Sequence, residues 1–411
     1  MEKVRIAVAG AGAIGLRHIE ETQKSQGAKL SAIIDPSPKA AEVAQKEGVP
    51  LYDSLQECFA KDRPDGLVLA TPNHMHVEQG LECIAAGIPV LVEKPLAHTL
   101  DEGKRLVEAA ERANAKLLVG HHRPHSPILH KAVEIVRSGI LGPIVGVIGS
   151  AVFYKPDDYF DGPYSWRKEP GGGPILINMV HEVGNLRAMV GEIVAVQAVA
   201  SNATRKFAVE DTVAINLRFE NGALGSFLLS DTAASAKSWE QTSQENKAYP
   251  TYPDEDAYVV IGSDGSLAVP TMRLKHYARK EDRSWWKPFK SETIPFERAD
   301  PLALQIEHFA AVIRGETKPL VSGRDGLQNL RVVDAIAEAA KTGKTVDVPT
   351  DREKGIHENW RVPHRQRSRR RWWLREDLTT EARHLPRPRP APDSWIRPCN
   401  AGSLASAPTS A

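Results

Sequence analysis

The chain has 411 residues, of which 41% are hydrophobic and 26% charged, which is typical of a globular protein with two domains. The formal net charge of +1 combines a basic end with residues 1–360, which hold 42 basic and 48 acidic residues, and this mildly acidic body gives no support for nucleic-acid binding. The apolar runs are too short to span a membrane or to act as an export signal. Three widely spaced cysteines without a Cys-x-x-Cys pair argue against a disulfide framework and a thiolate metal site, so we expect a cytoplasmic protein without a structural metal.

The first 120 residues alternate between short apolar runs and stretches of helical character. The apolar runs lie at 4–9, 30–34, 67–70, 90–92 and 117–119. Continuous runs of this length suit strands that are buried on both faces of a parallel sheet. Thr99 and Glu102 have the spacing of a capping box and open one of the intervening helices. The alternation predicts a doubly wound Rossmann domain over residues 1–123.

A glycine motif directly follows the first apolar run, with Gly10, Gly12 and Gly15 spaced as G-x-G-x-x-G. Between a strand and a helix, this spacing permits a tight turn, a close backbone approach to a pyrophosphate, and tight packing of the helix. The first helical residues, Ala13 and Ile14, would present their backbone amides to the anion. The motif therefore predicts a dinucleotide site, although a glycine turn without a ligand is the alternative.

Asp35 ends the second apolar run, about 20 residues after the third glycine, where an acidic residue accepts a ribose hydroxyl. A carboxylate at this place repels a 2′-phosphate, so we expect NAD as the cofactor. Lys39 lies close enough in sequence to weaken that preference, which keeps NADP possible. A turn role for Asp35 before Pro36 is the alternative.

Polar residues follow the third and fourth strands at the edge where open α/β sheets bind ligands. Thr71, Asn73 and His76 come after the third strand, and Glu93 and Lys94 come after the fourth. We expect these residues to contact the cofactor. The ammonium group of Lys94 can also polarise a substrate hydroxyl or carbonyl for hydride transfer, whereas the alternative is a surface lysine paired with Glu93.

After a linking helix at 127–138, the pattern changes to strands joined by short turns. Apolar or alternating runs lie at 145–154, 195–201, 213–219, 224–230, 258–261 and 266–269, with hairpin turns at Asn221-Gly222 and Ser263-Asp264-Gly265. We predict an α+β domain over residues 124–350 with a mainly antiparallel open sheet. Helices at 178–190, 301–314 and 325–342 would cover one face of this sheet, and the other face would form a homo-oligomer contact.

A second set of polar residues is predicted to bind substrate. If a helix starts after Ile177, Asn178 and His181 share one face of it by i, i+3 spacing. A neutral histidine in that position can act as a general base, and the alternative is a capping or packed histidine. The residues expected to contact substrate are His122, Arg123, Trp166, Arg167 and Asn178.

Taken together, these motifs resemble the Gfo/Idh/MocA oxidoreductase family from about residue 4 to about residue 349. The resemblance rests on the glycine motif, Thr71-Pro72-Asn73 with His76, Glu93-Lys94-Pro95, and Gly171-Gly172-Gly173 with His181. It implies an NAD(P) cofactor and a sugar, polyol or related secondary alcohol or ketone as substrate. It further implies that Lys94 and His181 are catalytic and that the peptide bond before Pro95 is cis.

The chain departs from the family pattern at two positions. Many members have an aspartate four residues before the helix histidine and another three residues after it, where this chain has Ile177 and Gly184. Either Lys94 and His181 act alone, or the substrate differs, or catalysis is lost. The leading hypothesis is a dehydrogenase in which His181 or Lys94 accepts the hydroxyl proton. The second hypothesis is a non-catalytic NAD(P)-binding regulator or sensor.

The end of the chain differs in composition from the rest. Residues 361–411 contain 11 arginines, no lysine and four acidic residues, and Pro386, Pro388, Pro390 and Pro392 alternate with arginine and alanine. Such a proline pattern forbids a helix or an interior strand. We predict that 361–411 is a disordered tail outside the fold, and a basic tail that binds RNA or anionic lipid is the less favoured alternative. We therefore expect neither nucleic acid nor membrane among the partners.

Overall fold

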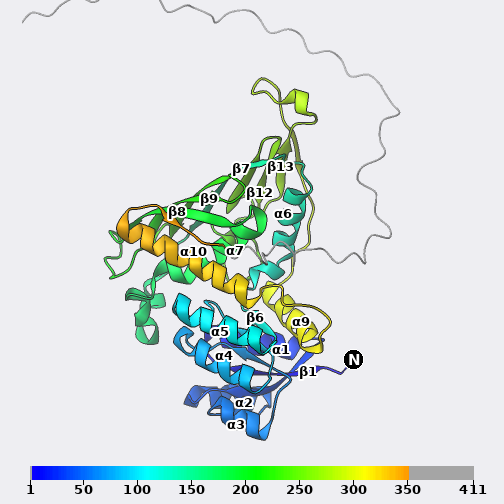
Figure 1. The fold of residues 1–411 in the computed structure, drawn as a ribbon, viewed down its shortest axis with the longest axis vertical. Coiled ribbons are helices and arrows are strands. Elements are labelled where there is room, and N and C mark those ends of the chain that lie inside the picture. Colours follow the sequence, from blue (N-terminus) through cyan, green and yellow to red (C-terminus); the bar gives the residue numbers. More distant parts are fainter. Residues whose placement is uncertain (1, 351–411) are drawn as a thin grey trace, which may run out of the picture. The chain divides into compact units, whose positions relative to one another are not determined.

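The computed structural model describes residues 2–350, and Figure 1 shows that they form two sheets with packed helices. Within this range, one sheet has the order β3-β2-β1-β4-β5-β6 and the other has the order β14-β13-β12-β11-β7-β10-β9-β8-β15. No helix of this part is long and apolar enough to cross a membrane. The segment 361–411, predicted to be a disordered tail, lies outside the described residues.

The first sheet confirms the predicted Rossmann arrangement. All its strand pairs are parallel, and the strand order reverses between β1 and β4, which in open α/β sheets is where ligands bind. The sequence analysis missed β3, which has only two residues. The strands are β1 (Val4–Ala9), β2 (Ala28–Ile34), β3 (Leu51–Tyr52), β4 (Gly66–Leu69), β5 (Val90–Val92) and β6 (Leu117–Val119).

Helices connect the strands of the first sheet and cover both of its faces. They are α1 (Ala13–Lys24), α2 (Pro38–Glu47), α3 (Leu55–Lys61), α4 (His76–Ala85) and α5 (Leu100–Arg112). The capping box predicted at the start of α5 is present: the side chain of Thr99 accepts from the backbone of Glu102, and Glu102 bonds back to Thr99. These connections bring the carboxyl ends of the strands to one edge.

Helix α9 (Pro301–Arg314) was predicted to cover the second sheet, and this prediction is wrong. Its apolar side chains Ile306 and Phe309 share a core with Ile6 and Val8 of β1, and the helix packs beside α1. Ile19 of α1 packs in the same core, so α9 completes the cover of a face of the first sheet that α1 covers only in part. The predicted division of the chain at residues 123 and 124 stays a prediction.

The second sheet is mixed, with mostly antiparallel pairs as predicted. Both predicted hairpin turns are present, one between β9 and β10 and one between β11 and β12. The exception is β10, which pairs with β7 in parallel. The strands are β7 (Ile144–Val152), β8 (Ile193–Ser201), β9 (Thr212–Phe219), β10 (Leu224–Ser230), β11 (Tyr258–Gly262), β12 (Gly265–Val269), β13 (Arg273–His276), β14 (Lys290–Thr293) and β15 (Val346–Asp347).

One face of the second sheet packs against helices. These are α6 (Pro127–Arg137), α7 (Val180–Met189), the short α8 (Trp239–Thr242) and α10 (Gly323–Thr342). A π-helical turn (Ile175–Met179) leads into α7, so the predicted helix start at Asn178 lies inside this turn. Helix α10 contacts both β8 and α5, which places it against both sheets (Figure 1). Every residue of α7 is buried.

Candidate active site

The glycine motif has the geometry of a tight turn at the end of β1. Gly10 has a φ of +93°, and a Cβ there would lie 2.6 Å from the carbonyl oxygen of Ala70. A Cβ on Gly15 would lie 1.9 Å from the carbonyl oxygen of Gly10. Only glycine fits at these two positions, because the first helix must start immediately against the neighbouring strand.

The start of α1 faces open space instead of protein. A Cβ on Gly12 would meet no atom within 4 Å. No side chain accepts a hydrogen bond from the backbone amides of the first turn of α1, which includes Ala13 and Ile14. An uncapped helix start beside open space fits a pyrophosphate, whose oxygens accept hydrogen bonds and are attracted by the helix dipole.

Asp35 lies at the end of β2, next to the glycine turn. Its Oδ2 accepts from the backbone amide of Ala11 at 2.7 Å, and its Oδ1 accepts from the backbone amide of Ser37 at 2.8 Å. Burial raises the pKa of the carboxyl group, but the hydrogen bonds from Ser37 and Ala11 outweigh burial and hold the pKa below its ordinary value. Asp35 is therefore ionised at neutral pH, as a ribose acceptor that repels a 2′-phosphate must be.

The loops after β4 and β5 are fastened to each other. The ring nitrogens of buried His76 lie 2.9 Å from the carbonyl oxygens of Thr71 and Pro95. The Thr71 hydroxyl donates to the Oε1 of Gln79 at 2.6 Å, and Asn73 starts a short 3-10 turn. Both nitrogens of His76 thus point at the backbone, so the ring braces the two loops.

Glu93 and Lys94 point in different directions after β5. The buried carboxylate of Glu93 lies 2.8 Å from the Nε2 of His18 and accepts from the backbone amide of Lys94 at 2.9 Å. Burial raises the pKa of Glu93, but the contacts with His18 outweigh burial and lower it. The Lys94 ammonium does not pair with Glu93 through a direct hydrogen bond; it donates to the carbonyl oxygen of Ile177 at 3.4 Å. The Lys94–Pro95 peptide bond is cis, as the resemblance implied.

Three histidine rings gather beside Lys94. The ring centroid of His181 lies 5.2 Å from that of His122 and 6.0 Å from that of His121. Burial, followed by the positive charges of Lys94 and Arg123, lowers the pKa of His181 well below its ordinary value. Burial also lowers the pKa of His122 to about 4. These rings are therefore neutral, and the buried Nδ1 of His181 has no hydrogen-bond partner among the described residues.

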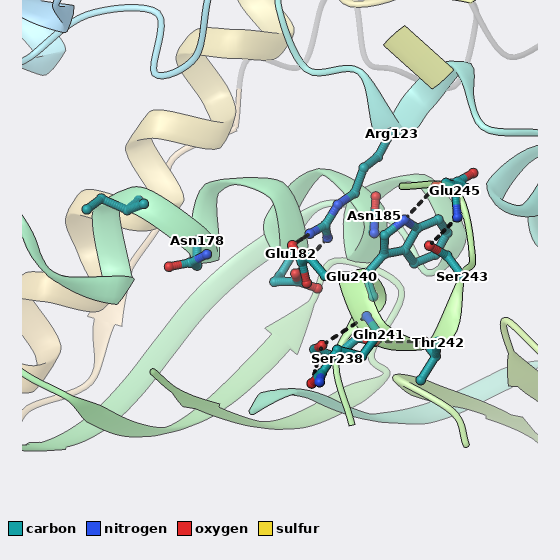
Figure 2. A network of polar contacts seen from close by, with 12 residues as sticks. Arg123, Asn178, Glu182, Asn185, Ser238, Glu240, Gln241, Thr242, Ser243 and Glu245 are labelled. Carbon is teal, nitrogen blue, oxygen red and sulfur yellow. Dashed lines mark hydrogen bonds and ion pairs between the residues drawn. The ribbon is translucent and has the colours of Figure 1, made fainter. Parts of the chain in front are cut away.

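Arg123 is engaged by two carboxylates and not by Asn178. Its Nη1 donates to Glu182 at 2.6 Å and its Nη2 to Glu240 at 2.5 Å. Figure 2 shows the side chain reaching these two acids, with Asn178 apart from them. The guanidinium carbon also lies 5.5 Å from the centre of the Trp239 ring. Sequence reasoning missed both acids, although a glutamate inside the apolar helix after His181 is a signal for a buried ion pair.

Asn178 is held by a lysine that the sequence analysis also missed. The Nζ of Lys155 donates to the Oδ1 of Asn178 at 2.7 Å, and Lys155 is 7% exposed. Burial lowers the pKa of Lys155 to about 8, although the carboxylate of Asp231 opposes this effect. Lys155 follows β7 outside any recognisable motif, so only the rarity of a buried lysine could have singled it out.

The remaining predicted residues, Trp166 and Arg167, lie in a 3-10 segment (Gly162–Lys168). Trp166 is exposed, whereas Arg167 stacks on Tyr159 with 3.8 Å between its guanidinium carbon and the ring centre. Burial lowers the pKa of both Lys94 and Lys155, and the charge of Arg167 adds to the effect in each case. The structure therefore brings Lys94, His181, His122, Asn178 and Arg167 together, while Arg123 belongs to an adjoining ion-pair cluster.

Comparison with known families agrees with this geometry. The model described as "Oxidoreductase family, NAD-binding Rossmann fold" matches residues 4–121. The model described as "Oxidoreductase family, C-terminal alpha/beta domain" matches residues 133–348. Both describe the Gfo/Idh/MocA oxidoreductases, and together they cover most of the chain.

Similar proteins include dehydrogenases and reductases. A 1,5-anhydro-D-fructose reductase of Ensifer adhaerens is 27% identical over 361 residues, which cover 84% of this chain and 99% of that protein. An inositol 2-dehydrogenase of Rubrobacter xylanophilus is 27% identical over 368 residues, which cover 85% and 94%. The solved WlbA dehydrogenase from Bordetella pertussis, in complex with NADH and UDP-GlcNAcA, is 27% identical with a TM-score of 0.68 and covers 85% of this chain and 100% of its own.

Proposed function

The chain belongs to the Gfo/Idh/MocA oxidoreductase family, and on this premise we propose that it is an NAD(P)-dependent dehydrogenase of a sugar, a polyol or a related secondary alcohol. The relatives support this substrate class, because their names include an anhydrofructose reductase and an inositol dehydrogenase. The observation that carries the proposal is the contact of Lys94 with Ile177, in the turn that leads into the helix of His181, with Lys94 and the uncapped glycine turn at the same edge of the first sheet.

The residues around the glycine turn fit a dinucleotide. The open space at Gly12 and the uncapped start of α1 suit a pyrophosphate. The ionised carboxylate of Asp35 suits a ribose hydroxyl. The nicotinamide ring, when bound, supplies the hydride acceptor or donor. We assign cofactor contacts to Gly10, Gly12, Ala13, Ile14, Gly15, Asp35, Thr71 and Asn73. We assign His76 and Glu93 to bracing the site, because their polar atoms face the protein.

Lys94 is the proton acceptor in this proposal. Burial lowers the pKa of its ammonium group, which makes the neutral amine accessible. His181 is a poorer base, because burial and the neighbouring charges lower its pKa far below the ordinary value. Neutral His181 instead hydrogen-bonds the reacting hydroxyl through a ring nitrogen and orients it toward Lys94.

The backbone supplies part of what the missing aspartate would supply. The carbonyl oxygen of Ile177 accepts a hydrogen bond from Lys94, which fixes the direction of the ammonium group without a carboxylate. A carbonyl cannot take up a proton at neutral pH, so the proton leaves Lys94 to solvent. Asn178 contacts substrate but carries no proton, because an amide does not titrate in this range.

The test is a panel of sugars and polyols, with NAD⁺ reduction followed by absorbance at about 340 nm. Turnover of a secondary alcohol supports the dehydrogenase. Tight NAD binding without turnover of any member would favour the regulator or sensor instead, which needs no chemistry at Lys94.

We also propose that the chain forms a homo-oligomer through the exposed face of the second sheet. On β9, Val213, Ile215 and Leu217 are buried and the residues between them are exposed. The strand registers put Val199, Leu228, Ile148 and Leu224 of the neighbouring strands on that exposed face. Four exposed aliphatic side chains on a single sheet face exceed the scattered apolar residues of an ordinary surface, so a second copy of this chain would cover them.

A cytoplasmic location is the remaining part of the proposal. Cys58 and Cys83 are buried free thiols, which persist in a reducing compartment. Fractionation of the cells that produce the protein would test this location. Recovery of the protein outside the cytoplasmic fraction would contradict it.

A further inference from the structure

Building on the proposed dehydrogenase function, we propose that Lys155 and Arg167 form a subsite for a carboxylate on the substrate. The enzyme would then select sugar acids over neutral sugars. Neither residue is needed for the hydride or proton step, so the two cations act in specificity.

Lys155 keeps donors available that the protein does not use. An ammonium group has three N–H donors, and among the described residues only the Oδ1 of Asn178 accepts one within hydrogen-bond distance. The Oδ2 of Asp231 lies 3.7 Å away, beyond a hydrogen bond. Asp231 is itself held by Arg205, whose Nε lies 3.0 Å from the other carboxylate oxygen. A buried ammonium with unused donors is costly unless a ligand satisfies it.

Arg167 supplies a second cation that has no carboxylate partner among the described residues. Its Nη1 donates to the carbonyl oxygen of Tyr159 at 2.7 Å, while its Nε is buried and has no partner among the described residues. The Tyr159 ring connects the two cations, because the Lys155 Nζ lies 4.7 Å from its centre and the Arg167 guanidinium carbon 3.8 Å. Within residues 2–350, Arg167 forms no salt bridge and no hydrogen bond to a carboxylate.

The nearby acids are held mainly by other cations. Glu93 contacts His18 and Glu240 pairs with Arg123. Asp231 is shared, because its Oδ1 lies 3.0 Å from Arg205 and its Oδ2 lies 3.7 Å from Lys155. Burial lowers the pKa of Lys94 and of Lys155, and the nearby charge of Arg167 lowers both further, although Glu93 opposes the shift of Lys94 and Asp231 that of Lys155. A ligand anion would relieve this repulsion, and two cationic donors match the two oxygens of a carboxylate.

Two consecutive residues place the proposed carboxylate subsite close to Lys94, which accepts the proton of the substrate. Ile177 binds Lys94 through its carbonyl oxygen, and Asn178 binds Lys155 through its side chain. The carboxylate would therefore lie within one small sugar molecule of the carbinol that gives up its proton to Lys94. A phosphate would offer the same charge on a larger group, so sugar phosphates form a separate arm of the test.

The test compares matched pairs: D-glucuronate with D-glucose and D-galacturonate with D-galactose, with D-glucose 6-phosphate as the phosphate arm. Binding to the enzyme with NADH is measured by calorimetry, and kcat and KM are measured with NAD⁺. At least one hexuronate should bind about 10- to 100-fold more tightly than its hexose, the range expected for hydrogen bonds to a charged group. Equal binding within both pairs, or preference for the hexoses or for the phosphate, would overturn the proposal.

Variants assign the effect to Lys155. Lys155→Met should raise KM for the hexuronate about 10- to 100-fold more than it raises KM for the matched hexose, whose binding changes only through the freed Asn178 side chain. Lys155→Arg should restore much of the loss, and Lys61→Met, at an exposed lysine on α3, should change nothing. If Lys155→Met does not fold, the wild-type pH profile still decides. Its KM for hexuronate should rise above about pH 8, where Lys155 loses its charge, and a flat profile would contradict the proposal.

The experiments can contradict the proposed dehydrogenase function and the proposed carboxylate subsite independently of each other. Lys155-dependent binding of a hexuronate without hydride transfer would contradict the dehydrogenase function and keep the subsite. Oxidation of neutral sugars with no preference for acids would keep the dehydrogenase and remove the subsite.

Discussion

The Nζ of Lys94 lies 3.4 Å from the carbonyl oxygen of Ile177, so a backbone oxygen contacts the lysine at the position where the family resemblance implied an aspartate. A neutral carbonyl does not stabilise an ammonium charge as a carboxylate does. Burial therefore lowers the pKa of Lys94, although the charges of Glu93 and Glu240 oppose this effect. The Lys94 amine is thus neutral more often than that of an ordinary lysine.

The pH dependence of alcohol oxidation should show this lowered pKa. The neutral amine accepts the proton, so kcat/KM should rise with pH and level off above the apparent pKa of Lys94, which should lie below its ordinary value of about 10.4. His181→Asn should lower the rate and keep the shape of the profile. A profile controlled by a group that disappears in His181→Asn would make His181 the base.

Cofactor preference should depend on Asp35. Asp35→Ser removes the charge that repels a 2′-phosphate, and NADP affinity should rise about tenfold relative to NAD, as expected for a Coulomb term of about 1 to 2 kcal/mol near a surface. Calorimetric titration with both cofactors measures the ratio. Asp101→Ser, at an exposed acid on α5, is the matched control and should leave the ratio unchanged. Tighter binding of NADP than of NAD by the unaltered chain would contradict the proposed role of Asp35 in cofactor preference.

The ion pairs of Arg123 should stabilise the fold more than they affect substrate binding. Arg123→Met leaves the carboxylate of Glu182 buried without its cation, which should cost about 3 to 5 kcal/mol of the free energy of unfolding. Arg123→Lys should recover part of it. Thermal and urea unfolding measure the change. A stable Arg123→Met variant with a large increase in KM would return Arg123 to the substrate contacts first predicted from the sequence.

Association should depend on the exposed face of the second sheet. Leu228→Lys combined with Ile148→Lys places two charges on the apolar part of this face and should reduce the mass measured by light scattering to that of a monomer. Leu304→Lys, at an exposed leucine on α9, should not. A monomer mass for the unaltered chain at micromolar concentration would contradict the proposed oligomer.

Sequence periodicity located most of the fold, because strands buried on both faces and alternating strands leave distinct patterns. It failed for α9, whose apolar face is equally suited to either sheet, and for β3, which is too short to form a pattern. Local motifs singled out Lys94, within Glu93-Lys94-Pro95, and His181, which follows Gly171-Gly172-Gly173 by a few residues. Lys155, Glu182 and Glu240 were missed because their partners come from other elements, which sequence spacing does not reveal.

The most direct test of the central claim is the turnover of Lys94→Ala beside its NADH affinity. The account predicts that NAD⁺ reduction by the best substrate of the panel falls about 100- to 10,000-fold, the usual contribution of a general base, while NADH binds within about twofold of the unaltered chain. Lys104→Ala, at an exposed lysine on α5, should keep full turnover. Retained turnover in Lys94→Ala would contradict the account, because it would show that the proton leaves the substrate by another route.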